Sequence, residues 1–545
     1  MNKYKLYIKF LFLGVFISLQ FSCNEDILQV EPVNEYLSTN YFQTEEQVFD
    51  GLVAAYDPVG WSFAYGQWIS YVMFGEIRSD NANAGGDPSD NDQPGWQQLD
   101  DFLNTNTNTV IHPMYRRNYI GIFRANTVLA VDNENLDQAL VDQYKAEAKF
   151  LRAYYHFELF KNFGPIPVVD RLITPDEVDL ERNTMSEVFE LITNDLEEAI
   201  PLLPISVSSS ETGRVTQGAA EALLGKAYLY WADLDNDDSG KFDLAAQHLQ
   251  NVVDFGIYEL EDDYQSLFAF GLKNPGESVF EVQHNPLYTS DWGWAEGVDG
   301  NAMIQLCGIR GLCDEHPDYE AGWGFMLPTS GLWNHYLADD AYRKDVTLCD
   351  EAELEAEIID AGGSCSPVID LTQSNPIDFT GYWNEKYANY KSYEGTNVNG
   401  GDNNLTKDGN TYVIRYADVL LMLAEAQHRG SGSDGDAMNN IDLVRERAAG
   451  PGDNSGNFRT AQQLMSDEGM SLLEVIWYER RAEFAMEGDR WYDLVRSGRA
   501  NASLFEGDPL RSGNFEEKHL WLPIALEETE VATNLTEYPD ASLFQ

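Results

Sequence analysis

The sequence LGKAY at residues 224–228, followed by AAQHLQNV at residues 245–252, decides the fold class. Together these stretches are close to the tetratricopeptide pattern, in which Leu-Gly-x-x-Tyr on one helix faces Ala-x-x-x-Phe on the next. A second pair of stretches fits this pattern, because residues 416–427 are followed by Ala-x-x-x-Ile-x-x-Val at residues 437–444. Helical repeats need several neighbours to bury their apolar faces. We therefore predict a mostly α, tetratricopeptide-like scaffold of about four helix pairs, with generic helical hairpins as the alternative.

Two other helices carry their own boundary signals. Apolar residues recur at three- and four-residue steps from Tyr144 to Leu159, and the glycine-proline pair at residues 164–165 ends this helix. A further helix is predicted over residues 186–200, where Thr184 and Glu187 form a capping-box pattern.

The region between about residues 272 and 410 has a different composition. Helical periodicity is sparse there, while glycine, asparagine, aspartate and proline are frequent. A long irregular region inside a compact protein is usually functional. We therefore predict a helical scaffold over about residues 42–270 and 412–500, interrupted by an irregular, loop-rich ligand-binding insertion over about 272–410.

The N-terminus has the features of an export signal. Several lysines precede an apolar run from Phe10 to Leu19, which is too short to span a bilayer comfortably. We interpret residues 1–22 as a signal peptide and residues 23–545 as the mature chain. Cys23 resembles a lipoprotein attachment site, although the leucine usual three residues earlier is displaced; ordinary secretion with an incidental Cys23 is the alternative. The acidic residues 24–26 resemble the surface-export tag of Bacteroidota lipoproteins.

The charge of the chain limits which molecules it can bind. The chain has 35 basic and 91 acidic side chains, a formal net charge of −56. Such a surface repels nucleic acid, so we expect no nucleic-acid partner. It also disfavours an acidic polysaccharide, unless the binding cleft locally reverses the sign or uses a cation. Adaptation to salty water is another cause of such acidity, because screening reduces self-repulsion.

The remaining cysteines are Cys307, Cys313, Cys349 and Cys365. An even number of cysteines in an exported chain favours disulfides. We predict the pairs Cys307–Cys313 and Cys349–Cys365, because each would close a short loop in a stretch without helical pattern. A zinc site is the competing interpretation, but the spacings are not C-x-x-C and no histidine pair accompanies them.

Several motifs in the C-terminal half resemble the SusD/RagB family of outer-membrane nutrient-uptake lipoproteins. They are RYADVLLMLAEA at residues 415–426, YERRAEF at 478–484 and EGDRWYDLVR at 487–496, supported by FGPIP at 163–167 and LPI at 522–524. The chain departs from the family at its end, where the usual Q-N-P-G-Y-like sequence is absent and residues 538–540 read YPD.

The resemblance implies a lipid-anchored protein of the outer membrane that faces the cell exterior and performs no chemistry. It implies a SusC-like TonB-dependent transporter as partner, and an oligosaccharide or polysaccharide as ligand, with a peptide as the alternative. No cofactor is required. The acidity favours a neutral glucan over an anionic glycan. A glycoside hydrolase is a weaker alternative, because the sequence has no H-E-x-x-H, P-loop or G-x-S-x-G motif.

Aromatic side chains in loops are the predicted sugar platforms. An indole or phenol ring offers an apolar, slightly negative face to the C–H groups of a pyranose, and polar groups at the rim bind the hydroxyls. The predicted platforms are Trp96, Trp292, Trp294, Trp323 and Tyr319, and the predicted polar partners are Arg78, Asp80, Asn81 and Asp92. Packing in the core is the alternative for each tryptophan. Trp231, Trp477 and Trp491 lie on helical faces and are expected in the core.

Two charged motifs have simpler interpretations. Glu479, Arg480, Glu483, Glu487 and Arg490 recur at three- and four-residue steps, so we predict that opposite charges meet along one helix in a structural role.

A calcium site is predicted from Asp235, Asp237, Ser239 and Asp243, which resemble the first half of an EF-hand loop. Ala246 replaces the bidentate glutamate of position twelve, and a solvated repeat turn is the favoured alternative.

Overall fold

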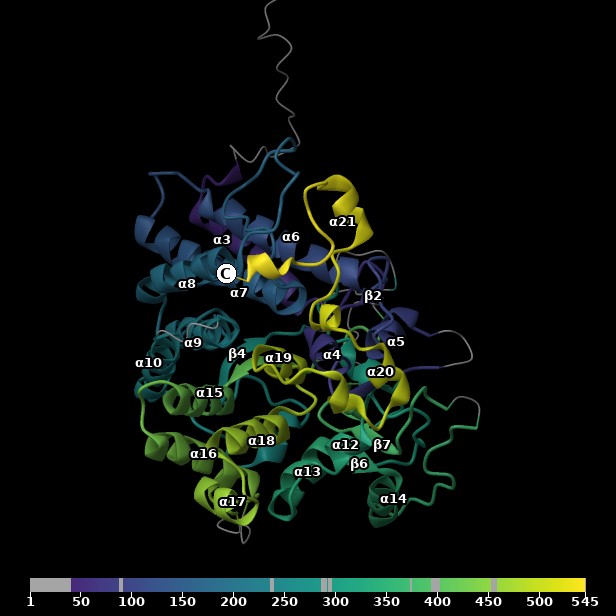
Figure 1. Cartoon of the computed structure of the whole chain (residues 1–545). Helices are drawn as coiled ribbons and strands as arrows, with labels where there is room; N and C mark the ends of the chain where they lie inside the picture. Colours follow the sequence, from purple (N-terminus) through teal and green to yellow (C-terminus); the bar gives the residue numbers. More distant parts are fainter. Residues whose placement is uncertain are drawn as a thin grey trace, which may run out of the picture.

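The computed structural model describes residues 41–87, 92–235, 240–285, 292, 297–372, 375–393, 402–451 and 458–544. The helices of the repeat scaffold are α3 (Glu45–Tyr56), α6 (Ile111–Leu129), α7 (Gln138–Phe163), α8 (Met185–Ala199), α9 (Gln217–Leu234), α10 (Lys241–Asp254), α15 (Tyr416–Arg429) and α16 (Asp434–Ala448). Figure 1 shows them stacked from top to bottom on one side of the molecule. Within the described residues, no helix is both long and apolar enough to cross a membrane.

The scaffold is a series of antiparallel helix pairs. α3 packs on α6, α7 on α8, α9 on α10 and α15 on α16, and α8–α9 and α10–α15 contacts join successive pairs. Gly225 of α9 shows why the repeat pattern needs a small residue, because a Cβ there would lie 2.6 Å from Leu249 Cγ on α10. The prediction of about four tetratricopeptide-like pairs is confirmed.

The predicted helix boundaries also hold. The helix expected over residues 186–200 is α8, and Thr184 and Glu187 form the capping box at its start. α7 covers the apolar stripe from Tyr144 to Leu159 and ends at Gly164, whose φ of 67° lies in the region that favours glycine.

The C-terminal helices return across the scaffold. They are α17 (Ala461–Asp467), α18 (Leu472–Phe484), α19 (Arg490–Arg496), α20 (Pro509–Asn514) and α21 (Leu526–Val531). α17 packs on α16 and α18, whereas the other four contact the earlier helices α4 (Tyr71–Glu76) and α5 (Pro94–Asp100) or the loops beside them. α4 and the α18–α19 loop approach so closely that a Cβ on Gly75 would lie 1.7 Å from the Gly488 oxygen.

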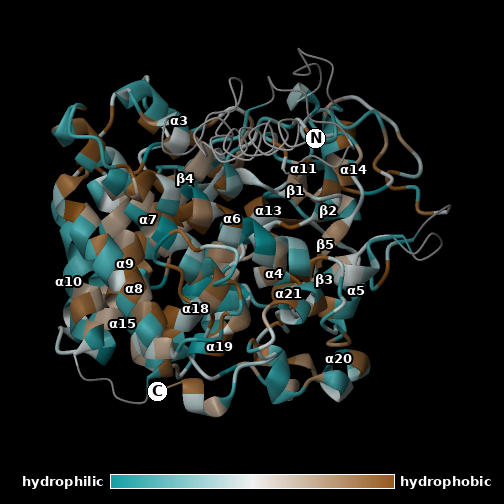
Figure 2. Cartoon of the chain, turned by 90° about the horizontal axis from the view of Figure 1, so that it is seen from above, coloured by the Kyte–Doolittle hydropathy of each residue, from teal (hydrophilic) through white to brown (hydrophobic). Residues whose placement is uncertain are grey.

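The irregular insertion begins and ends at one antiparallel strand pair. β4 (Ser278–Val282) pairs with β8 (Thr411–Arg415), so the chain leaves and re-enters the scaffold at neighbouring positions. The other strands are β1 (Phe63–Ala64), β2 (Gln67–Trp68), β3 (Ala82–Gly85), β5 (Phe325–Pro328), β6 (Leu348–Asp350) and β7 (Tyr382–Asn384). Figure 2 shows the strand-rich region around β1, β2, β3 and β5 on the side opposite α8, α9 and α10.

The insertion contains more helix than the sequence suggests. Its helices are α11 (Met303–Cys307), α12 (Ser330–Trp333), α13 (Ala341–Thr347) and α14 (Glu351–Asp360). Three of them have seven residues or fewer, which is about two turns at most, so they have too few apolar repeats to be seen as a periodic pattern. A separate small core around Leu354, Ile358 and Trp383 packs this part together.

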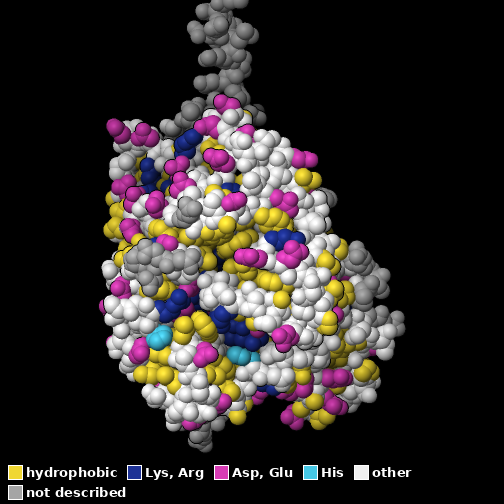
Figure 3. Space-filling model, in the orientation of Figure 1, with side chains coloured by type: hydrophobic (Ala, Val, Ile, Leu, Met, Phe, Trp, Pro, Cys, Tyr) yellow, Lys and Arg dark blue, Asp and Glu magenta, His cyan; other side chains and the backbone are white. Residues whose placement is uncertain are grey.

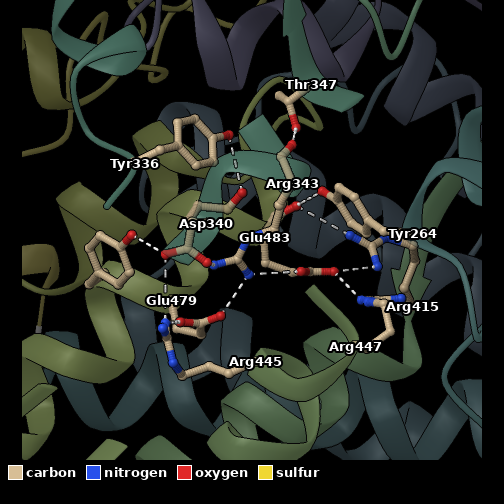
Figure 4. A network of polar contacts seen from close by, with 12 residues as sticks. Tyr264, Tyr336, Asp340, Arg343, Thr347, Arg415, Arg445, Arg447, Glu479 and Glu483 are labelled. Atoms are coloured by element: carbon tan, nitrogen blue, oxygen red, sulfur yellow. Dashed lines mark hydrogen bonds and ion pairs between the residues drawn. The ribbon is translucent and has the colours of Figure 1, made fainter. Parts of the chain in front are cut away.

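A buried charge network joins the insertion to the scaffold (Figure 4). Arg343 of α13 donates hydrogen bonds to both Glu479 and Glu483 of α18. Glu479 accepts a further hydrogen bond from Arg445 of α16, and Glu483 accepts one from Arg415 of β8. Arg447 and Glu277 complete the cluster. The carboxylates and arginines come from different elements, so their attraction fixes the positions of those elements relative to one another.

The predicted arrangement of these charges along one helix is therefore wrong. α18 ends at Phe484, before Glu487 and Arg490. Glu487 instead pairs with Lys386 and Arg415, and Arg490 pairs with Asp80. The structural role that we predicted for these residues is consistent with their burial.

The predicted cysteine pairing is also wrong. The disulfide joins Cys313 and Cys365, which are 52 residues apart, while Cys307 and Cys349 are free and buried. Cys307 belongs to the main core and Cys349 to the core of the insertion, so each is held by apolar packing away from its sequence neighbour.

Candidate functional site

Exposed Trp292 and partly buried Trp323 form a stacked pair on the surface of the insertion. Trp292 is 46% exposed and its ring lies 5.8 Å from that of partly buried Trp323, with 29° between the planes. The β1–β2 hairpin supports both rings from below: Trp68 meets them edge-on at 6.0 and 5.5 Å, and Phe63 meets Trp292 at 5.7 Å. We call Trp292, Trp323, Trp68 and Phe63 the aromatic shelf.

Polar groups lie at the rim of the aromatic shelf. Trp292 Nε1 donates a hydrogen bond to Asp402 Oδ2 at 2.6 Å, which orients the exposed ring. Arg310 donates to the Trp323 carbonyl oxygen at 3.0 Å and to Asp87 Oδ2 at 2.8 Å. The shelf thus combines an apolar face with nearby carboxylate and guanidinium groups, which is the composition of a sugar-binding surface.

Four of the predicted binding residues are buried and structural. Trp96 has no exposed surface and packs on Phe74 in the core. Tyr319 is 7% exposed and donates to Glu385. Arg78 and Asn81 are also buried, with Arg78 bonded to the carbonyls of residues 519 and 520. Their assignment as ligand-binding residues is wrong, because each already has its packing or hydrogen bonds inside the protein.

The other three predicted residues have different positions. Asp80 forms ion pairs with Arg481 and Arg490, so it belongs to the interior between α4 and α19. Asp92 is partly buried, and its N–H donates to the Asp87 oxygen, which places it near the rim of the shelf. Trp294 lies outside the described residues.

Comparisons with known proteins identify the family. Residues 26–229 match the family described as "Starch-binding associating with outer membrane", and residues 351–539 match the SusD family. A solved laminarin binding SusD-like protein is 31% identical with a TM-score of 0.75, and the match covers 91% of this chain and all of that one. The chain belongs to the SusD family. The family resemblance and the helical fold predicted from the sequence are confirmed.

Other members of the SusD family support this result. Surface glycan-binding protein A from Bacteroides thetaiotaomicron, solved in complex with laminarihexaose, is 26% identical with a TM-score of 0.76, over 90% of this chain and 98% of that chain. SusD-like protein P2 of Formosa agariphila is 26% identical over 509 residues, 91% of each chain. The SusD-family proteins similar to this chain are thus associated with the outer membrane and include surface glycan-binding proteins.

Sequence reasoning missed part of the shelf in this SusD-family protein. Phe63, Trp68, Arg310 and Asp402 were not predicted. The sequence WSFAYGQW at residues 61–68 carries a usable signal, because three aromatic residues flank a Tyr-Gly turn in a short hairpin. Arg310 and Asp402 carry no such signal, since their positions depend on contacts between distant segments.

Calcium binding to the turn before α10 stays a prediction. Asp237 and Ser239 lie outside the described residues. Asp235 accepts a hydrogen bond from Lys241, and Asp243 accepts one from the Ser431 N–H, both at 2.6 Å. The part of the chain that the structure describes contains no group of three or more potential metal ligands.

Proposed function

We propose that this protein is a cell-surface lipoprotein that captures an oligosaccharide or polysaccharide and delivers it to a TonB-dependent outer-membrane transporter. The observation that carries the proposal is the aromatic shelf, with exposed Trp292 stacked on Trp323 in a protein of the SusD family. Anchoring through Cys23 and the transporter partner rest on the sequence signals and the family resemblance. The protein binds its ligand without cleaving it.

The proposed ligand is a neutral glucan of the laminarin type. Two similar solved proteins are named for laminarin or laminarihexaose binding. The net charge of −56 opposes the approach of polyanionic glycans, whereas a neutral chain is unaffected. The edges of the glucose rings then have Asp402, Asp87 and Arg310 within reach as hydrogen-bond partners.

Calorimetry with laminarihexaose tests the proposal. Trp292→Ala and Trp323→Ala remove the stacking surface, and we expect each to weaken binding by about 2 kcal/mol, roughly 30-fold. Trp333→Ala is the matched control, because Trp333 is also partly buried and stacked, on Tyr382 at 4.1 Å, but lies outside the shelf. Unchanged affinity in both shelf variants, with a folded circular dichroism spectrum, would remove the basis for the proposal.

Two alternatives give different results in the same experiments. A peptide ligand would be held through its backbone hydrogen bonds, so its affinity should tolerate the loss of Trp292 better than that of a glycan does. A glycoside hydrolase would release reducing ends when the purified protein is incubated with laminarin, whereas we expect none.

A further inference from the structure

Three arginines lie near one another at α18 and α19, and two of them bind the same carboxylate. Arg490 binds Asp80 through two hydrogen bonds, of 2.7 and 2.9 Å, and Arg481 Nη2 lies 3.1 Å from the same carboxylate. Arg499 follows α19, and its guanidinium lies 3.8 Å from the centre of the Trp477 ring. Figure 3 shows Lys and Arg side chains gathered near the middle of this face, with a histidine beside them, where Figure 1 places α18 and α19. We call Arg481, Arg490 and Arg499 the arginine cluster.

The arginine cluster has hydrogen-bond donors that the protein does not use. Arg499 Nε donates to Ser497 Oγ, but neither of its Nη atoms has an acceptor among the described residues. The same holds for Nη1 of Arg481 and of Arg490, whose other nitrogens bind Asp80 and Asn81. Buried donors without a partner occur elsewhere in the described residues, but these Nη atoms are not among them. They are therefore in contact with solvent.

Burial and the mutual repulsion of the arginines both act on the cluster. Burial, and after it the charge of Arg490, lowers the pKa of Arg481 and of Arg499 to about 10 each. His335 lies against the same group, and burial together with Arg481 and Arg490 lowers the pKa of its imidazole. The network around Glu483 differs, because each of its arginines is bonded to carboxylates. In the part of the chain that the structure describes, the three guanidinium groups of the arginine cluster have one carboxylate in direct contact, that of Asp80.

We propose that the arginine cluster is a binding site for one small oxyanion, a sulfate or carboxylate group. Free Nη donors on three guanidinium groups offer charge-assisted hydrogen bonds to an oxyanion, and such planar donors suit sulfate and carboxylate oxygens. The ligand is small because the net charge of −56 repels a polyanion, while a small anion needs to approach only one locally positive place. This site is separate from the aromatic shelf and does not depend on the glycan that the shelf binds.

Thermal unfolding of the full mature chain in sodium sulfate and in sodium chloride of equal ionic strength tests the proposal. We expect sulfate to raise the melting temperature saturably beyond the effect of chloride. Sulfate also stabilises proteins through exclusion from their surface, so the diagnostic quantity is the difference between variants. Arg499→Gln and Arg490→Gln should each weaken the saturable sulfate effect about ten-fold or more. Asp80→Asn should strengthen it, because it neutralises the carboxylate that binds Arg481 and Arg490.

Arg116→Gln is the matched control. Arg116 also stacks on an aromatic ring, that of Tyr65, at 4.4 Å, and it forms no ion pair among the described residues, but it lies on α6. We expect this variant to keep the wild-type response to sulfate. An equal response in the Arg499→Gln, Arg490→Gln and Arg116→Gln variants would overturn the proposal, as would equal stabilisation of the wild type by sulfate and chloride.

Calorimetry with two further ligands distinguishes the source of the anion. Tighter binding of glucose 6-sulfate or glucuronate than of inorganic sulfate would assign the site to a charged substituent of a saccharide. Tighter binding of inorganic sulfate would assign it to a free anion. Methyl glucoside, which lacks the charge, should not compete with either.

Discussion

Glu483→Gln tests whether the buried charge network holds the insertion on the scaffold. The Glu483 carboxylate is completely buried and accepts hydrogen bonds from Arg343, Arg415 and Arg447. Glutamine has nearly the same shape, but it removes the negative charge and turns one acceptor into a donor. Three guanidinium groups then surround a neutral amide in a region without water access.

The pKa of Glu483 gives the size of the effect. Burial raises this pKa, but the charges of Arg447, Arg415 and Arg343 outweigh burial and lower it from 4.5 to about 2. A change of one in a pKa corresponds to about 1.36 kcal/mol. The pKa of Glu483 falls by about 2.5, so the folded protein favours the ionised carboxylate by about 3 kcal/mol. Removal of one partner from a buried ion pair costs about 3–5 kcal/mol in other proteins. We expect a loss of this size in the free energy of unfolding.

The same pKa predicts a pH dependence. Because the folded-state pKa lies below the unfolded value near 4.5, the stabilisation is fully present above that pH and is lost as the pH falls toward 2. The wild type should therefore lose about 3 kcal/mol more than the Glu483→Gln variant over this range.

Urea denaturation followed by tryptophan fluorescence at pH 7 measures the loss. Glu474→Gln is the control on the same helix: Glu474 is exposed and accepts the Ser471 N–H in a capping box, a role that glutamine can also fill. We expect this control to change stability by less than about 0.5 kcal/mol. A similar loss in both variants would refute the reasoning.

Three further outcomes follow from the structure. Gly75→Ala should reduce the free energy of unfolding by more than about 3 kcal/mol in a urea titration, because its methyl group would collide with the Gly488 oxygen, which is backbone and cannot move aside. Cys313→Ser should lower that free energy by about 2–4 kcal/mol, since the bond to Cys365 closes a long loop. If the wild type is alkylated before reduction, mass spectrometry should find both of these cysteines unlabelled. His156 should make stability fall as the pH drops below 6.5, because burial lowers its folded-state pKa to about 3 while the unfolded chain takes up the proton; urea midpoints from pH 7.5 to 5 should show a smaller decline in His156→Gln.

The helical scaffold could be predicted because its signals are local. The spacing of Gly225 and Tyr228 and the capping box of Thr184 depend on residues a few positions apart, and the structure reproduces them. The arginine partners of Glu483 come from α13, α16 and β8, and the partner of Cys313 is 52 residues away. Such pairings depend on how distant segments meet, which spacing along the chain does not encode.

The aromatic site could be predicted only in part, for a related reason. Residue type tells which side chains can stack on a sugar, but it does not tell which way they face. Trp96 and Leu99 lie three residues apart on one buried face of α5, a spacing that favours the core, whereas Trp292 lies in no helix or strand and is exposed. The role of Trp68 emerges only when its hairpin is placed beneath Trp292 and Trp323.

The pairing of β4 with β8 has a consequence for how proteins with this fold diversify. Since the polypeptide departs from the helical frame and rejoins it at almost the same point, a cassette between Val282 and Thr411 can be exchanged or lengthened without displacing the helices on either side. Each doubling of a flexible loop costs only about 0.6 kcal/mol in closure entropy. Replacement of this one contiguous segment can therefore change the surface that the insertion presents, provided that the new segment keeps an arginine where Arg343 meets Glu479.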